Sequence, residues 1–167
     1  MTVDLSDVRF CRWGGLGSVG VKYDWAAVLD GHSEGVADVA ALEARLEVAL
    51  PPSYRAFLLF TDGITDMMSR ASEVGWFPDV DPETFRCWAP EETGDPVVRR
   101  APVPPGTEAD EEYLSATLKI GEFDDDGVIL LNPLAVTDEG EWEAWHLAAW
   151  IPGVHRFPSF WDLWQKL

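Results

Sequence analysis

The chain contains 167 residues, of which 30 are acidic and 12 are basic, and its formal net charge is −18 at pH 7. This excess of acids argues against a nucleic-acid ligand, and it favours a basic partner or a very soluble surface. One domain of this length buries about 70% of the surface that its unfolded chain exposes, so a single core is sufficient. We therefore expect one domain over residues 1–167.

The N-terminal stretch MTVDLSDVRFCRW lacks the basic start and the apolar run of a signal peptide. The longest apolar runs, such as residues 128–131, are too short to cross a bilayer. These features predict a cytoplasmic protein with no membrane partner. Cys11 and Cys87 have no CxxC spacing, so we expect two small buried thiols rather than a disulfide or a metal site.

The first 34 residues predict a short strand at 8–13 and a short helix at 24–29, separated by a glycine-rich loop. Gly15, Gly17 and Gly20 of that loop satisfy GxGxxG, a pattern in which the backbone approaches a pyrophosphate. The helix that follows is too short for such a site, and no second strand precedes residue 36. We interpret the pattern as a flexible loop and predict no cofactor.

Two helices are predicted next. Apolar residues recur at spacings of three and four from 36 to 50, which indicates an amphipathic helix. Pro51 and Pro52 cannot continue that helix, but they suit the first turn of another. The second helix is apolar on most sides, so we expect it to be buried and to end in a left-handed cap at Gly63.

The middle of the chain predicts short, irregular strands at 76–90 and a mobile surface insertion at 92–112. Strands and turns then alternate, followed by a final helix at 159–167. Short turns between successive strands imply antiparallel pairing. The predicted fold is therefore α+β, a single domain with a mainly antiparallel β-sheet flanked by helices. Its later strands are expected at 114–120, 127–132 and 142–150.

Four segments resemble the SUKH superfamily, which includes bacterial immunity proteins and yeast regulators of cell-wall synthesis. They occur in the family's order, which is harder to obtain by chance than any one motif. LPPSYRAFLLFTDG (50–63) resembles the family's leading motif, and LKIGEFDDDGVILLN (118–132) resembles its strand, acidic glycine turn and strand. EWEAWH (141–146) resembles its next strand, and SFWDLWQKL (159–167) resembles its closing helix.

Catalytic motifs are absent from the sequence. The histidines are His32, His146 and His155, and no HExxH, GxSxG or GxxxxGKS pattern occurs. No sequence pattern supports a catalytic dyad of Cys87 and His146, since any cysteine and histidine in a chain could be proposed as such a pair. His146 lies within a predicted strand and is interpreted as structural. We predict no catalytic residue and no enzyme activity.

The acidic turn at 122–129 imitates part of a calcium-binding EF-hand loop. Glu122, Asp124 and Asp126 stand at alternating positions, but Pro133 replaces the glutamate that would complete the site. Strands rather than helices are predicted on both sides. A hairpin turn is the preferred interpretation, weak calcium binding is the minor alternative, and no metal site is predicted.

Clustered acids and two tryptophans are the candidate partner-binding residues. A solvated loop and a solvated hairpin explain the acids equally well. The two tryptophans lie an odd number of positions apart on a strand, so at least one is expected at the surface unless both sheet faces are covered. An exposed tryptophan rimmed by acids would suit a protein-binding hot spot. The candidates are Glu108, Asp110, Glu111, Glu112, Glu122, Asp124, Asp125, Asp126, Trp142 and Trp145.

The resemblance to SUKH proteins implies a noncatalytic immunity protein that binds and neutralises a cognate bacterial toxin in the cytoplasm. Many such toxins are nucleases and tend to be basic, so an acidic partner complements them. The alternative is an intracellular regulatory or scaffold protein on the same fold. A scaffold predicts several weaker partners and no protective effect.

Overall fold

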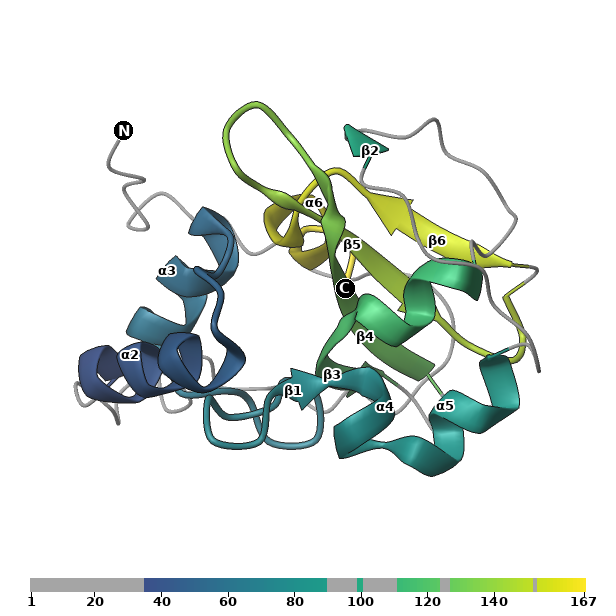
Figure 1. Cartoon of the computed structure of the whole chain (residues 1–167), viewed down its shortest axis with the longest axis horizontal. Coiled ribbons are helices and arrows are strands. Elements are labelled where there is room, and N and C mark those ends of the chain that lie inside the picture. The colour runs from purple at the N-terminus through teal and green to yellow at the C-terminus, as the bar shows by residue number, and fades with distance from the viewer. Residues whose placement is uncertain (1–34, 90–98, 101–110, 124–126, 152) are drawn as a thin grey trace, which may run out of the picture.

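The computed structural model describes residues 35–89, 99–100, 111–123, 127–151 and 153–167 (Figure 1). The predicted N-terminal strand, glycine loop and short helix lie outside these residues, as does Cys11. Most of the predicted insertion at 92–112 also lies outside them. Within the described ranges, no helix is long and apolar enough to cross a membrane.

A sheet forms the centre of the fold, with strand order β1-β3-β4-β5-β6, and each neighbouring pair on this path is antiparallel. The short β2 (Arg99–Arg100) pairs in parallel with the end of β4. This arrangement confirms the predicted α+β class and its mainly antiparallel sheet. The strands on the main path are β1 (Gly75–Trp76), β3 (Leu118–Phe123), β4 (Gly127–Val136), β5 (Trp142–Leu147) and β6 (Val154–Phe157).

The two predicted N-terminal helices are present as α2 (Gly35–Leu46) and α3 (Pro52–Phe60). Glu141, which lies 88 positions from Ser53 in the sequence, caps the start of α3. Its carboxylate accepts hydrogen bonds from Ser53 N (2.9 Å) and Ser53 Oγ (2.7 Å). The helix ends at Phe60, and Gly63 (φ +81°) lies in the following loop. The prediction that Gly63 caps the helix is therefore wrong.

The middle segment folds as two short helices rather than strands, which corrects the prediction. They are α4 (Phe77–Val80) and α5 (Pro82–Trp88). The carboxylate of Asp81 accepts a hydrogen bond from Thr84 N (3.1 Å), and Pro82 occupies the first turn of α5. An acidic N-cap followed by proline begins a helix, so the proline marks a start rather than an interruption.

Cys87 is exposed at the end of α5, which corrects the prediction of a buried thiol. The neighbouring Phe85 and Trp88 pack against the core. On a helix, adjacent positions point in different directions, so packing of these two partly buried side chains against the core turns Cys87 outward.

The C-terminal third confirms the predicted alternation of strands but shifts several boundaries. A 3₁₀ helix, η2 (Glu111–Ala116), occupies the start of the strand predicted at 114–120. β5 ends at Leu147 rather than at 150, and β6 is an additional strand. The final helix, α6 (Phe160–Trp164), begins at the N-cap Ser159, whose hydroxyl oxygen accepts a hydrogen bond from Asp162 N (3.1 Å).

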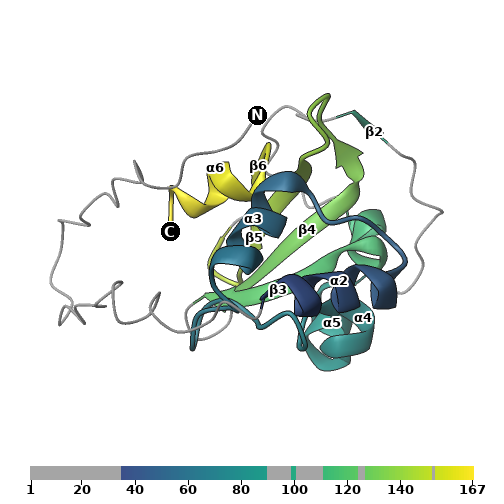
Figure 2. The same ribbon diagram turned by 90° about the vertical axis from the view of Figure 1, so that its left-hand side faces the viewer.

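Two hydrophobic cores lie on opposite faces of the sheet, because successive residues of β4 point to opposite sides. One core joins Ile129 and Leu131 to α2, α3 and α6, and Figure 2 shows α3 in front of the sheet. The other joins Val128 and Leu130 to α4, α5 and η2. Both faces of β4 and β5 are therefore covered.

Candidate functional site

A groove of about 530 Å³ opens beside the end of α3 and the edge of β3. Residues 61–70, which follow α3 directly, form most of its lining, and Glu73 and Glu122 complete it. Ile64 and Met68 are buried in the first core, whereas Met67 is half-buried. The groove thus combines apolar lining with a charged rim.

The charged residues of the groove are mainly acids. Asp66 and Glu73 are exposed, Asp62 is half-buried, and Glu122 has a side chain that is 67% exposed. No cation in the described part of the chain forms an ion pair with Asp62, Asp66 or Glu73. Arg70 is the basic residue of the lining. Among the described residues, Asp62, Asp66 and Glu73 of the groove therefore have no ion-pair partner, whereas Glu122 pairs with Lys119.

Backbone pairing with β3 holds the groove loop in place. Ser69 N donates to Ile120 O, and Glu122 N donates to Met67 O, both at 2.9 Å. Gly121 lies between these two bonds, and a Cβ built there would stand 2.2 Å from Met67 O. Only glycine allows the loop and the strand to approach so closely.

The ends of the loop are also fixed by hydrogen bonds. Asp62 Oδ1 accepts from Ala71 N (2.9 Å), and Glu73 Oε2 accepts from Arg70 N (3.0 Å). Asp66 adopts a positive φ of 62°, a conformation that aspartate tolerates better than most residues. The acids of the groove are consequently presented on a constrained backbone.

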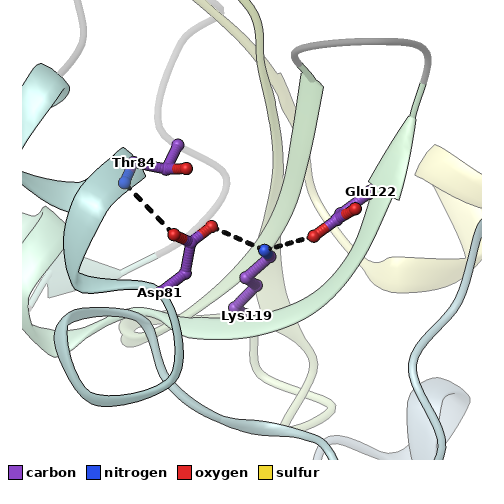
Figure 3. A network of polar contacts seen from close by, with 4 residues as sticks. All are labelled: Asp81, Thr84, Lys119 and Glu122. Carbon is purple, nitrogen blue, oxygen red and sulfur yellow. Dashed lines mark hydrogen bonds and ion pairs between the residues drawn. The ribbon is translucent and has the colours of Figure 1, made fainter.

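Lys119 connects the edge of the groove to α4 and α5 (Figure 3). Its Nζ lies 2.7 Å from Asp81 Oδ2 and 2.6 Å from Glu122 Oε1. Burial alone lowers the pKa of Lys119, but the hydrogen bonds with Asp81 and Glu122 outweigh burial and raise it. For Asp81, burial alone raises the pKa, but the hydrogen bonds from Lys119 and Thr84 outweigh burial and lower it. Both groups are held in their charged forms.

A second polar cluster is buried in the other core. Arg156 Nη2 lies 2.9 Å from Glu143 Oε2, and Trp145 Nε1 donates to the same carboxylate oxygen at 2.8 Å. The guanidinium also stands 5.4 Å from the ring centroid of Trp145. The side chains of Arg156 and Glu143 are 4% and 2% exposed. This cluster joins β5 to β6 and is closed to solvent.

The predicted partner-binding residues are only partly described. Glu122 lies in the groove, whereas Glu108, Asp110, Asp124, Asp125 and Asp126 lie outside the described residues. Glu111 and Glu112 begin η2, and their side chains are not among those described. The antiparallel pairing of Phe123 with Gly127 confirms that a hairpin joins β3 to β4.

Trp142 and Trp145 do point to opposite faces of β5, as predicted, but both are buried, at 7% and 0% exposure. Helices cover both faces of the sheet, so neither tryptophan is exposed beside acids in this structure. The prediction of an exposed tryptophan hot spot at these positions is therefore wrong, because both faces of the sheet are covered.

Sequence reasoning missed the groove acids Asp62, Asp66 and Glu73, and the buried Glu143. The first motif ends within the groove loop, but its TDG segment was interpreted as a helix cap. Glu143 could have been recognised as unusual because it falls among strongly apolar strand residues. No local pattern marks the pairing of the loop with β3.

Other potentially reactive side chains are engaged in packing. His146 forms edge-on ring contacts with Phe123 at 5.3 Å and with His155 at 6.2 Å. The described ranges contain no group of three or more His, Cys, Asp or Glu residues placed to hold a metal ion.

Comparison with family models matches residues 36–165 to the SMI1 / KNR4 family (SUKH-1). The chain belongs to this family. The SUKH-1 match runs from the start of α2 to the end of α6, so it includes the groove, both cores and the Lys119 network. Comparisons with curated proteins and with solved structures find no match.

Proposed function

We propose that this SUKH-1 protein is a noncatalytic, cytoplasmic immunity protein that binds a cognate bacterial toxin and neutralises it. The observation that carries this proposal is the groove, which displays Asp62, Asp66 and Glu73 without an ion-pair partner among the described residues, on a backbone tied to the sheet. Family membership supports the proposal, because the SUKH superfamily includes immunity proteins. The groove is suited to recognising a basic protein.

Charge supplies the physical basis of recognition. The net charge of −18 attracts a basic toxin over a long range and speeds encounter at low salt. The backbone of the groove loop is already tied to β3, so little backbone conformational entropy is lost when its acids meet a partner. Many toxins of this kind are nucleases, whose substrates require a basic surface.

The buried charged side chains form ion pairs and hydrogen bonds within the fold, which supports a binding role rather than catalysis. Lys119 is bridged by two carboxylates, and Glu143 holds Arg156 and Trp145. Their charges stabilise contacts between elements of the fold. A catalytic acid or base instead needs access to the proton that it transfers.

Coexpression tests this function. The chain is produced in bacteria together with the product of each neighbouring gene, and growth and copurification are measured. We expect one neighbouring product to arrest growth alone, to be neutralised by this chain, and to copurify with it in a one-to-one complex whose affinity falls as salt rises.

Two results would contradict the proposal. If no neighbouring product is toxic and neutralised, the immunity role fails. Capture of several weak partners without protection would instead favour the regulatory or scaffold role. Measuring binding at two salt concentrations separates a charge-driven complex from a largely apolar one.

A further inference from the structure

We propose that the groove and the neighbouring Phe60 form the surface on which the partner docks, and that the partner presents lysine or arginine next to an apolar side chain. This inference rests on the proposed function, because it names the contact surface and the chemistry of the toxin segment. The surface comprises Phe60, residues 61–70, Glu73 and Glu122.

Phe60 supplies an observation that is independent of charge. It is the last residue of α3, it is 46% exposed, and it directly precedes Thr61 of the groove lining. Tyr54 and Leu58 of the same helix are buried. A large exposed aromatic side chain that directly precedes the groove lining in the chain is a candidate anchor for a protein interface.

The apolar lining suits the stem of a basic side chain. Met67 is half-buried in the groove, and the buried Ile64 and Met68 lie beside it in the lining. Lysine and arginine carry aliphatic stems that pack on apolar surface while their charged ends reach acids. The flexible thioether side chain of Met67 can adapt to such a stem.

The charged rim selects for a mixed segment rather than a purely cationic one. Asp62, Asp66 and Glu73 attract a positive charge, but Arg70 lies in the same lining and repels a second one. A segment that carries an apolar residue beside its cation adds an apolar contact without adding a second positive charge near Arg70.

A peptide probe tests the surface without knowledge of the toxin. A blocked peptide of alternating lysine and leucine is titrated into the full-length chain, and amide chemical-shift changes are recorded by NMR. We expect the changes to be confined to residues 60–70, Glu73 and Glu122. A peptide of alternating lysine and serine should bind several-fold more weakly, because it lacks the apolar contact.

Substitutions with matched controls test the two parts of the surface. Asp66→Asn with Glu73→Gln should weaken peptide binding about tenfold, and Phe60→Ser should weaken it several-fold. Asparagine also tolerates the positive φ of residue 66. Glu83→Gln with Glu139→Gln removes the same charge outside the groove, and Trp150→Ser removes another exposed aromatic side chain. These controls should bind the peptide like the unmodified chain.

Either of two results would overturn the proposed surface. One is a set of shift changes spread evenly over the acidic residues. The other is equal loss of binding in the controls and in the groove variants.

The same variants separate this inference from the proposed function. If a neighbouring toxin is neutralised equally well by Asp66→Asn with Glu73→Gln and by Phe60→Ser, the immunity role stands and the docking surface is wrong. If no toxin is neutralised but the peptide maps to the groove, the immunity role is wrong and the surface recognises another basic protein.

Discussion

Glu143 and Arg156 form the most deeply buried of the described ion pairs, with side chains 2% and 4% exposed. Removing one charge of a buried pair leaves the other without compensation. We therefore expect Glu143→Gln to lower the free energy of unfolding by about 3–5 kcal/mol, measured by urea denaturation.

A surface pair provides the matched control. Arg55 and Glu43 lie 3.2 Å apart, but their side chains are 42% and 21% exposed. Arg55→Gln should therefore lower the free energy of unfolding by less than about 1 kcal/mol. Equal effects of Glu143→Gln and Arg55→Gln would mean that burial of the Glu143 pair does not determine its contribution.

The Lys119 network predicts a dependence of stability on pH at both extremes. The pKa of Asp81 is lowered from 3.8, so its contribution is present above that value and is lost as pH falls through the folded-state pKa. The pKa of Lys119 is raised from 10.5, so its contribution is present below that value and is lost as pH rises further. Between these limits, both charges stabilise the link from α5 to β3.

Lys119→Met tests this dependence. The variant should be less stable than the unmodified chain by about 1–3 kcal/mol near pH 7, because hydrogen bonds to charged groups are lost. The difference in free energy of unfolding should shrink as the pH falls through the lowered folded-state pKa of Asp81. A difference that stays constant in urea denaturation while Asp81 becomes protonated would show that this carboxylate does not act through Lys119.

At the scale of elements, the groove depends on the contact between its loop and β3. In Gly121→Ala, the new methyl group would collide with Met67 O, and backbone rather than a flexible side chain would have to move. We expect the hydrogen bonds of Ser69 and Glu122 to weaken and stability to fall by about 2 kcal/mol or more. Hydrogen exchange at the amides of Ser69 and Glu122 should rise.

Gly140→Ala is the comparison for that change. A Cβ at residue 140 meets no atom within 4 Å, although the φ of +83° makes the backbone unfavourable for alanine. Gly140→Ala should lower the free energy of unfolding by about 1 kcal/mol, and hydrogen exchange at the amides of Ser69 and Glu122 should not become faster. If Gly121→Ala behaves in the same way, close approach of the loop does not stabilise the groove.

The same elements explain what the sequence could predict. Apolar spacing was sufficient for α2, α3 and the core strands, because these patterns report which face is buried. The two short helices after β1 were predicted as irregular strands because neither is long enough to show a helical period. The start of α5 depends instead on the N-cap Asp81, whose carboxylate accepts a hydrogen bond from Thr84 N.

At the scale of the whole molecule, the groove could not be predicted because it is a product of tertiary pairing. Residues 67–69 and β3 are about fifty positions apart, and no spacing rule relates them. The covering of both sheet faces was likewise invisible locally, so Trp142 and Trp145 were expected to include an exposed residue. Net charge was predictive only of the chemistry of a partner, not of the place where it docks.

The net charge also predicts how the isolated molecule responds to salt. Thirty acids and twelve basic residues give more repulsive than attractive pairs. Raising NaCl from about 0.01 M to about 0.1 M shortens the screening length from about 30 Å to about 10 Å, which reduces repulsion across the surface. The buried Glu143–Arg156 pair is screened much less than surface charges. Weakened repulsion therefore dominates the change, and Tm measured by calorimetry should rise by several degrees as NaCl is added. At this chain length, about 1 kcal/mol corresponds to about 2–4 °C.

The double variant Glu83→Lys with Glu139→Lys provides the control. It lowers the magnitude of the net charge at exposed sites, so its Tm should rise less when NaCl is added. A fall in Tm with NaCl would instead mean that attractive surface pairs outweigh the repulsion.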